Sequence, residues 1–237
     1  MSRSTFLVFR ATTLAALLAL LLFSLGVGGW RIYHTYIALT PSEQIQRQLK
    51  EKLTGIESYY FRLTSTPVGS MQDVRYLVEL WSSSEDQLRV EATCLEEGAQ
   101  SRLQVVVRDG SQVYYFDPSL KKFYPVKGNG NMPEDIPVLT LEDYGRDLTE
   151  AGHFKLLGRE EKTRHNYYLV EVVPPNPHRY RCLDKVWLEA ESLLPVRIES
   201  YDSNLCLQQV TCFEHILLNP LLEAALFEVD QPAAVGQ

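Results

Sequence analysis

The 237-residue sequence predicts a mainly β protein, with one antiparallel sheet or barrel of about ten or eleven strands, two helices and an N-terminal membrane-spanning segment. Three observations predict this class. A run of 20 uncharged residues lies near the N-terminus, apolar residues then recur at every second position over most of the chain, and only two stretches show helical spacing. Strands and helices do not alternate, so a doubly wound nucleotide-binding fold is not expected.

The uncharged run, residues 11–30, is the predicted membrane anchor. A helix of this length spans about 30 Å, the thickness of the hydrocarbon core of a bilayer. Aromatic residues typical of a membrane interface follow it, namely Trp30, Tyr33 and Tyr36. Arg3 and Arg10 precede it without an acidic residue nearby, which favours a cytoplasmic N-terminus.

A cleaved signal peptide is the alternative to an anchor, since Ser24-Leu25-Gly26 offers a small-x-small site. With the anchor retained, residues 1–10 are cytoplasmic, 11–30 span the membrane and 31–39 form a linker. Both alternatives place residues 31–237 outside the cytoplasm. We expect a single-pass protein of the cell membrane with its C-terminal domain on the extracytoplasmic side.

The charge of that domain argues against nucleic acid as a partner. The chain has 23 Lys and Arg and 30 Asp and Glu, and the first 40 residues hold three arginines and no acid. Residues 41–237 therefore carry a net charge of −10. Binding to nucleic acid needs clustered basic residues that neutralise phosphates.

The first predicted helix covers residues 40–55. Thr40 can cap it, Pro41 suits its first position, and Glu43 completes a capping box. Apolar residues recur along one side at Ile45, Leu49, Leu53 and Ile56. This spacing predicts an amphipathic helix that packs on the sheet.

After this helix the period changes to two, as in strands. Six strands are predicted around residues 59–63, 74–80, 88–94, 103–107, 113–116 and 120–126. Asp109-Gly110 is a hairpin signal within this series. Five more strands are predicted in HFKLLGREEK, HNYYLVEVV, RCLDKVWLEA, LPVRIESY and LCLQQVTCFEHI.

A second amphipathic helix interrupts the strands. Thr140 caps it, Asp143 is at the capping-box position, and its apolar stripe is Leu141, Tyr144, Leu148 and Ala151. That stripe must be buried against the apolar face of the sheet, so both helices are expected to cover one face. A short helix at 221–226 and an extended piece around 227–229 end the chain.

The sequence does not indicate catalysis, a metal site or a cofactor. It contains no Gly-x-Ser-x-Gly, no Cys-x-x-Cys and no His-x-x-x-His. Cys94, Cys206 and Cys212 fall in predicted strands, and the four cysteines, with Cys182, are either buried free thiols or include one disulfide. Arg179 and Arg181 belong to a Pro-rich loop that is either solvated or meets headgroups or an acidic partner.

Three stretches resemble motifs of the LolA-like superfamily, which includes the lipoprotein carrier LolA, the RseB/MucB sensor domain and germination lipoproteins. These are Arg108–Pro118 (RDGSQVYYFDP), Val186–Arg197 (VWLEAESLLPVR) and Phe213–Phe227 followed by EVDQP. The resemblance extends over residues 40–232 and leaves 233–237 as a tail. Glu189 stands where the family usually has Asp.

The resemblance implies a fold and a ligand. The family fold is a curved, unclosed half-barrel whose apolar face is covered by helices and holds acyl chains. Mapped onto the apolar rows, the expected cavity is lined by Phe61, Leu63, Val78, Leu80, Val90, Val105, Val107, Tyr115, Tyr144, Leu148, Val170, Val186, Leu188, Val196 and Ile198. The residues alone do not distinguish such a cavity from a filled core.

The expected function is binding without catalysis. The first hypothesis is a membrane-anchored carrier, holder or envelope-assembly factor that binds lipid or the acyl chains of a lipoprotein. The alternative is a regulatory or scaffold protein of the RseB/MucB or germination type that binds a partner protein. A chain tethered by residues 11–30 is not suited to cross a periplasm as a soluble shuttle.

Overall fold

The computed structural model describes Ser24 and residues 39–69, 74–83, 86–95, 103–126, 140–162 and 165–229. The chain divides into two units, Met1–Gln44 and Ile45–Gln237. Of the predicted anchor, residues 11–30, only Ser24 is described, as an exposed helical residue. The remainder of the anchor, residues 1–10 and the tail at 233–237 lie outside the described residues. Within the described part of the chain, no helix has the length and apolar character needed to cross a bilayer.

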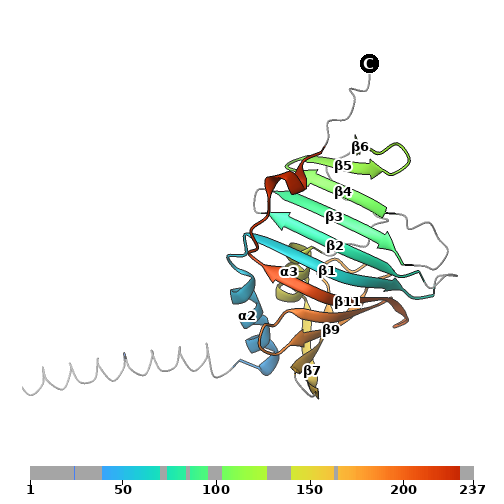
Figure 1. The fold of residues 1–237 in the computed structure, drawn as a ribbon. Helices are drawn as coiled ribbons and strands as arrows, with labels where there is room; N and C mark the ends of the chain where they lie inside the picture. Colours follow the sequence, from blue (N-terminus) through green and yellow to red (C-terminus); the bar gives the residue numbers. More distant parts are fainter. Residues whose placement is uncertain are drawn as a thin grey trace, which may run out of the picture. The chain divides into compact units, whose positions relative to one another are not determined.

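Eleven antiparallel strands form one unclosed sheet (Figure 1). In chain order they are β1 (Ser58–Pro67), β2 (Tyr76–Ser83), β3 (Gln87–Cys94), β4 (Leu103–Asp109), β5 (Gln112–Asp117), β6 (Lys122–Pro125), β7 (His153–Lys162), β8 (His165–Val173), β9 (Leu183–Glu189), β10 (Pro195–Tyr201) and β11 (Leu207–Leu218). Their spatial order is β6-β5-β4-β3-β2-β1-β11-β10-β9-β8-β7. Two meanders are thus joined where β1 pairs with β11, and β6 and β7 are the edges.

The turn between β4 and β5 forms one residue later than the hairpin signal suggests. Asp109 pairs with Gln112, so Gly110 and Ser111 make the two-residue turn. Gly110 has a φ of 57°, in the left-handed region that glycine adopts most readily.

Two helices were expected and both are present: α2 (Pro41–Leu53) and α3 (Leu141–Thr149). In the first turn of α2, the backbone N–H of Thr40 donates to the Glu43 carboxylate at 2.7 Å, which completes the predicted capping box. In α3 the Thr140 hydroxyl accepts from the backbone N–H of Asp143 at 3.1 Å. Both helix starts are therefore encoded locally.

The predicted helix at 221–226 is wrong in place and type. Over residues 221–227 the chain forms a single 3₁₀ turn, η2 (Ala224–Phe227), and Leu221 is fully exposed. Phe227 alone is buried, at 3% exposure. A single turn is enough to bring that one side chain onto the sheet, so no amphipathic stripe is needed.

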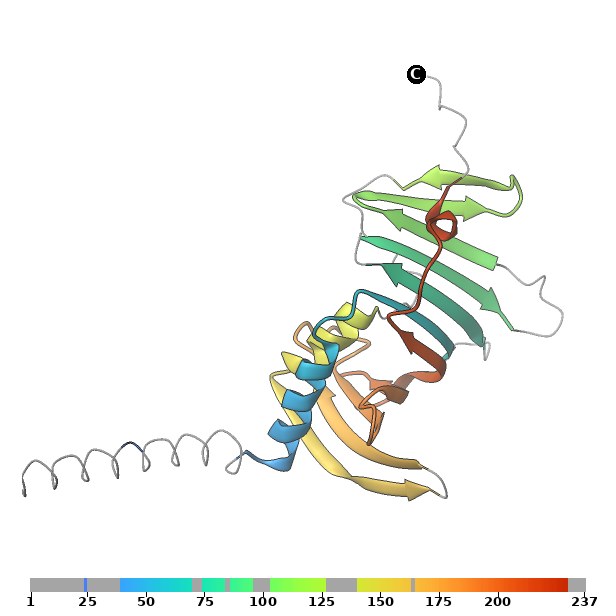
Figure 2. The ribbon, with the colours of Figure 1, turned by 60° about the vertical axis from the view of Figure 1, so that its left-hand side comes forward.

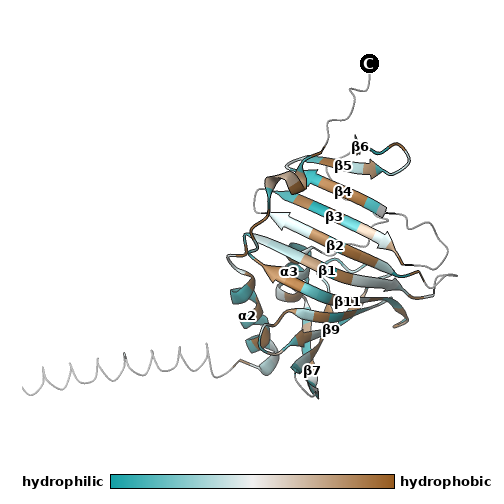
Figure 3. Ribbon diagram, in the orientation of Figure 1, coloured by the Kyte–Doolittle hydropathy of each residue, from teal (hydrophilic) through white to brown (hydrophobic). Residues whose placement is uncertain are grey.

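Cross-strand register defines the two faces of the sheet. Phe61 is paired with Leu80, Leu80 with Val90, and Val90 with Val106. We call the face that carries this row the inner face, and the opposite one the outer face. Side chains of α3, and of α2 from Ile45 onward, pack into the same apolar cluster as the inner row. The strands accordingly alternate between hydrophobic and hydrophilic residues (Figure 3).

The outer face has a smaller cover. In Figure 1, η2 lies in front of the sheet while α3 lies behind it. η2 contacts β3 and β4, and the Arg89 guanidinium donates to the Leu226 carbonyl at 3.1 Å. The final segment therefore crosses the outer face (Figure 2).

The predicted face of Val105 and Val107 is corrected by this register. Val106, between them, belongs to the inner row, whereas Val107 is paired with Arg89 and Val105 with Glu91 on the outer face. All three valines are buried, because η2 shields the outer side of β4. A strand buried on both faces has no alternation from which its inner side could be read.

Val196 is corrected for a different reason. The pairing of β10 with β9 shifts register between Pro195 and Arg197, which leaves Val196 in a β-bulge. Val196 is partly buried and borders a hollow with Trp187 and Arg197 on the outer face. A bulge adds one residue to the strand and so breaks the period-two assignment at that point.

The cysteines are all among the described residues, and all four are free. Cys206 is exposed in the turn before β11 and does not lie in a strand as predicted. Cys94, Cys182 and Cys212 are partly exposed. Of the two alternatives for the cysteines, the structure has free thiols and not a disulfide, but none of the four cysteines is fully buried.

We expect Leu80→Ala to lower the free energy of unfolding by about 2–5 kcal/mol, since the fully buried Leu80 leaves a cavity in the inner row. Urea denaturation of the full chain, followed by circular dichroism, measures the change. Leu120→Ala is the control, because Leu120 is 58% exposed and its truncation should change the value by less than about 0.5 kcal/mol. Equal effects of the two substitutions would contradict the assigned core.

Candidate functional site

Helices α2 and α3 contact each other over the inner face. The Gln46 side-chain amide donates to the Leu148 carbonyl at 2.8 Å and to the Thr149 carbonyl at 3.3 Å. A Cβ at Gly145 would lie 3.0 Å from Leu53 Cδ1, so the glycine allows close approach. The two helices thereby form one cover.

Tyr59, on β1, attaches the start of α3 to the sheet. Its hydroxyl donates to the Glu142 carboxylate at 2.7 Å and accepts from the backbone N–H of Leu141 at 3.2 Å. Burial, with the nearby Glu142 charge, raises the pKa of Tyr59 well above its ordinary value. The phenol therefore stays protonated and keeps both hydrogen bonds at any physiological pH.

A groove of about 300 Å³ remains between the two helices and the start of β1. Its floor is mainly apolar and is formed by Leu53, Ile56, Tyr59, Leu141 and Gly145. Its rim is polar and consists of Lys50, Thr54, Glu142, Arg146, Thr149 and Glu150, of which the lysine and arginine are positive and the two glutamates negative. We call this the α2–α3 groove. Figure 2 shows the two helices beside each other where it lies.

The groove floor is continuous with the core of the protein. Tyr59 and Leu141 belong to the inner apolar cluster, and Leu53 and Ile56 pack against it. A ligand in the groove would therefore lie directly on core side chains. To go deeper, it would have to separate the helices from the sheet.

Twelve of the fifteen residues predicted to line a cavity come together in the apolar cluster. They are Phe61, Leu63, Val78, Leu80, Val90, Tyr144, Leu148, Val170, Val186, Leu188 and Ile198, each at most 4% exposed, and Tyr115, which packs against them. Val105, Val107 and Val196 are on the outer face. None of the fifteen is among the described residues that line the groove. Whether ligand reaches the twelve inner residues stays a prediction.

Sequence reasoning missed the groove residues as a set, although it placed several of them singly. Leu53 and Ile56 were in the stripe of the first helix, and Leu141 was in that of the second. The signal that could have joined them is Gly145, a small residue on the face of α3 that meets α2. Its role becomes visible only when the helices are placed together.

A buried ion cluster ties the Pro-rich loop to α3. Arg181 Nε and Nη2 donate to Asp184 Oδ2 at 2.9 and 2.5 Å, and Nη2 lies 2.8 Å from Asp147 Oδ2 on α3. The side chains are 24%, 3% and 11% exposed for Arg181, Asp184 and Asp147. Neither sequence alternative for Arg181 anticipated this, because the charge pattern of the loop does not show its partners.

Within this ion cluster, the pKa values of Asp147 and Arg181 are both raised above their ordinary values. Burial raises the pKa of Asp147, and the Arg181 charge only partly opposes that effect. Burial works to lower the pKa of Arg181, but the two carboxylates raise it above its ordinary value.

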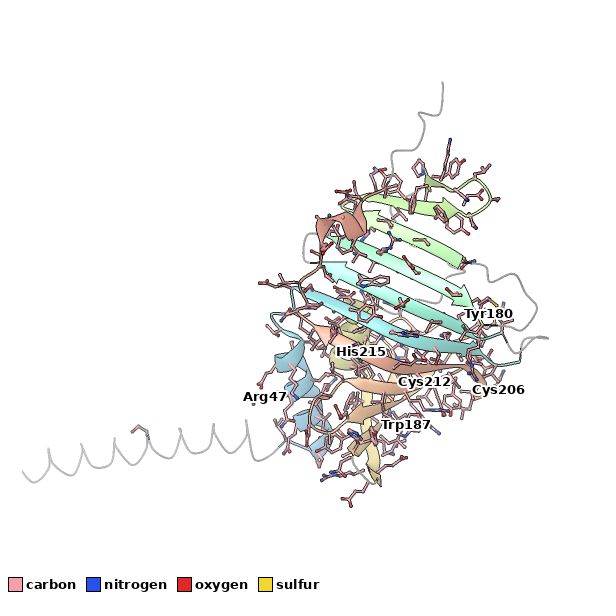
Figure 4. The ribbon with its side chains drawn as sticks, in the orientation of Figure 1. Arg47, Tyr180, Trp187, Cys206, Cys212 and His215 are labelled. Atoms are coloured by element: carbon pink, nitrogen blue, oxygen red, sulfur yellow. The ribbon has the colours of Figure 1, made fainter. Side chains whose placement is uncertain are left out.

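The other arginine of the Pro-rich loop, Arg179, is not part of this cluster. It stacks on Tyr180 at 4.3 Å, and Tyr180 is 54% exposed (Figure 4).

A second hollow, of about 390 Å³, lies on the outer face over β7 to β10. It is lined by Glu160, Tyr167, Trp187, Val196, Arg197 and Glu199. Arg197 stacks over the Trp187 ring at 5.6 Å, and its Nη2 pairs with Glu199 at 2.7 Å. Figure 4 labels Trp187 in this half of the sheet.

Within the part of the chain that the structure describes, no group of three or more His, Cys, Asp or Glu side chains is placed to hold a metal ion. His153 and His165 each face a single carboxylate, on Glu171 and Glu189 respectively. The side chains that line the two described hollows are apolar, charged or capable of hydrogen bonding, so they can bind a ligand by these three kinds of contact.

The family model described as MucB/RseB N-terminal domain matches residues 97–229. This range contains two of the three motifs that resemble the LolA-like superfamily and all but the end of the third. The match confirms that resemblance, in its MucB/RseB branch. A search of curated proteins finds no match.

Several solved structures are similar at low identity. An uncharacterised conserved protein from Thermus thermophilus is 10% identical, with 79% of this chain and 93% of that chain covered and a TM-score of 0.49. MucB in the MucA/MucB complex from Pseudomonas aeruginosa is 14% identical, with 80% and 61% covered and a TM-score of 0.46. A LolA superfamily protein from Nitrosomonas europaea is 14% identical, with 81% and 99% covered and a TM-score of 0.38. Similarities this distant say nothing about ligand or partner.

Arg181→Met is expected to destabilise the fold by about 3–5 kcal/mol, because two buried carboxylates would lose their cation. The matched control is Arg62→Met, since Arg62 pairs with Glu214 at 3.2 Å with both side chains almost half exposed. Its effect should be at most about 1 kcal/mol. Urea unfolding of the full-length variants measures both, and similar values would contradict the assigned role of the cluster.

Proposed function

Because this chain belongs to the MucB/RseB N-terminal domain family, we propose that it is a non-catalytic binding protein of the cell envelope that holds an acyl chain of a lipid or lipoprotein in the α2–α3 groove. Membership of the family supports a binding role in general. The choice of ligand rests on one observation, the apolar floor and charged rim of the groove.

The groove suits an amphipathic ligand. Its volume of about 300 Å³ is at the lower end of the range for small-molecule pockets, about 300–1,000 Å³. Burial of each methylene on the floor is worth about 0.8 kcal/mol and needs no directional bond. A polar headgroup at the rim can interact with charges of both signs. The positive ones are on Lys50 and Arg146, and the negative ones are on Glu142 and Glu150.

The twelve inner residues remain the proposed lining of a deeper site. In the structure they pack against one another and against the helices. An acyl chain longer than the groove would enter among them only if α2 and α3 moved away from the sheet. The groove is then the first part of the path and the inner row is the second.

Partner-protein binding is the second candidate, and the packing of the inner face favours it. A regulator or scaffold of this family needs no vacant interior, and here the inner row is filled by the protein's own side chains. In this function the helices would serve as a stable cover and the partner would bind elsewhere on the domain.

For the cellular arrangement we propose a single-pass protein of the inner or cell membrane. Residues 1–10 would be cytoplasmic, 11–30 would span the membrane, 31–39 would link, and 40–232 would form the extracytoplasmic domain with 233–237 as a tail. The uncharged run and the arginines that precede it support this arrangement.

We expect a photoactivatable fatty acid, incorporated into the lipids of cells that express the full chain, to cross-link to peptides of α2 and α3. Thr54→Trp, at the exposed rim of the groove, should reduce those cross-links several-fold by filling the groove. Peptide mass spectrometry provides the measurement.

Cross-links to residues 11–30 serve as the internal standard, because the proposed anchor contacts lipid in every variant. Thr66→Trp, on β1 outside the groove lining, is the matched control and should leave the α2 and α3 cross-links unchanged. Labelling confined to residues 11–30 in the unmodified chain would overturn acyl binding in the groove and leave partner binding as the function.

The intact mass of the purified full chain should include residues 1–30, and carbonate extraction should leave the protein in the membrane. Protease added to the extracytoplasmic side should remove the domain and spare a fragment containing residues 1–30. A mature N-terminus near residue 27 would instead show cleavage after the Ser24-Leu25-Gly26 site.

A further inference from the structure

The ion cluster at the last turn of α3 contains polar atoms whose bonding is incomplete. Asp147 Oδ2 and Asp184 Oδ1 are buried without a hydrogen-bond partner among the described residues. The side chains that carry these atoms are 11% and 3% exposed, respectively. Nearly all buried polar groups in folded proteins are hydrogen-bonded, because a buried acceptor without a donor loses its interaction with water and gains nothing in return. The cluster is therefore not explained by packing alone.

Arg181 serves the two carboxylates unequally. Its Nε and Nη2 both donate to Asp184 Oδ2, at 2.9 and 2.5 Å. Its Nη2 also lies 2.8 Å from Asp147 Oδ2, but without the alignment of a hydrogen bond. The charge of Asp184 is thus well compensated by the guanidinium. Asp147, on α3, has only the attraction of an arginine that is already bonded elsewhere.

The position of Asp147 on α3 adds to this imbalance. With both carboxylates ionised, the three side chains of the cluster carry two negative charges and one positive charge. Asp147 is in the last turn of α3, where the free carbonyls of the helix end place partial negative charges. Arg146, its neighbour on the helix, pairs with Asp143. A proton on Asp147 would make the cluster neutral.

The other elements packed against the last turn of α3 are mostly uncharged. Helix α2 contributes Gln46, whose amide donates to the last carbonyls of α3. Strand β8, which also contacts α3, contributes two buried valines to the apolar cluster. The charged groups that act on Asp147 are Arg181 in the loop, Asp184 on β9 and Arg146 on α3 itself.

We propose that Asp147 makes the attachment of α3 sensitive to protons: the last turn of α3 is held most firmly when Asp147 is protonated, and it loosens when the carboxylate ionises. Burial raises the pKa of Asp147, and Arg181 opposes this only in part. A group whose pKa is raised on folding stabilises the folded state below its ordinary pKa, and this stability is lost as the pH rises through the raised value. The attachment is therefore firmest in acid.

Loosening of this turn would affect the cover of the inner face. The same turn of α3 accepts the hydrogen bonds of Gln46, which join α3 to α2. A higher pH would thus weaken the contact between the two helices and ease the passage of an acyl chain from the α2–α3 groove toward the inner row. This consequence rests on the proposed acyl binding, whereas the proton-sensitive attachment of α3 does not.

Amide hydrogen exchange tests the attachment of α3, because it reports local opening. The full chain is placed in phosphatidylcholine nanodiscs and measured from about pH 4, the ordinary pKa of an aspartate, to about pH 8. Protection factors are corrected for the intrinsic pH dependence of exchange and are read for α3, with β2 as the internal reference. We expect the protection of α3 relative to β2 to fall severalfold as the pH rises.

Asp147→Asn distinguishes this proposal from an ordinary stabilising ion pair. Asparagine has nearly the same shape and cannot ionise, so α3 of the variant should keep its protection at every pH and exceed the unmodified chain severalfold at the highest pH. An ordinary ion pair predicts the opposite, a loss of protection in the variant. Asp143→Asn is the matched control, because Asp143 is a partly exposed carboxylate on the same helix, and it should leave the fall with pH unchanged.

The proposal is overturned if the protection of α3 in the unmodified chain does not depend on pH, or if Asp147→Asn shows the same fall. It is also overturned if that variant does not fold or is less protected at the highest pH, since the proposal requires the neutral side chain to be the better tolerated one.

Fatty-acid cross-linking in the same nanodiscs tests the consequence for lipid separately. Labelling of α2 and α3 should rise with pH in the unmodified chain and stay constant in Asp147→Asn. Absence of labelling at every pH would contradict acyl binding, while the exchange measurement would still decide on the attachment of α3. Labelling that is present but independent of pH would contradict only the link between the two.

Discussion

The structure depends on keeping one apolar face of an open sheet away from water. The sheet has edges at β6 and β7 and does not close on itself. Its strands therefore cannot shield from water the inner row, which begins at Phe61 and ends at Val106. Side chains of α2 and α3 pack into the same apolar cluster and shield part of that row. Strands of both meanders contribute buried side chains to the same cluster as Leu49, Tyr144 and Leu148.

The cover is held by polar contacts at its ends and apolar contacts at its centre. Tyr59 fixes the start of α3, Gln46 bonds its last carbonyls to α2, and the Arg181 cluster ties its far side to β9. Buried charges add little net stability, but they are selective for geometry because a misplaced partner leaves an unpaired charge. We infer that these contacts set where α3 sits, while burial of its stripe supplies most of the free energy.

The two faces of the sheet offer different kinds of binding. Beside the inner face, the groove has an apolar floor that continues into the core, which suits a flexible hydrocarbon. On the outer face, the hollow beside Trp187 is lined by aromatic, apolar and charged side chains.

The amino-acid sequence alone was sufficient to predict the class of fold, about ten or eleven strands in an antiparallel sheet, and both helix starts. These features arise from local causes: period-two alternation, the capping boxes at Thr40 and Thr140, and turn residues such as Gly110. It also identified twelve residues of the inner cluster, because one apolar face repeats along most strands. It failed for Val105, Val107 and Val196, where a second cover and a bulge override alternation.

Tertiary structure decided the features on which function depends. Whether the inner row is filled or hollow, where the helices leave a groove, and which carboxylates meet Arg181 are set by contacts between residues far apart in the chain. Gly145 illustrates the reason. It leaves room for the side chain of Leu53, which lies 92 positions earlier in the chain, and no local sequence pattern links the two residues. Local propensity determines elements, whereas a site arises from the space that elements leave once they pack.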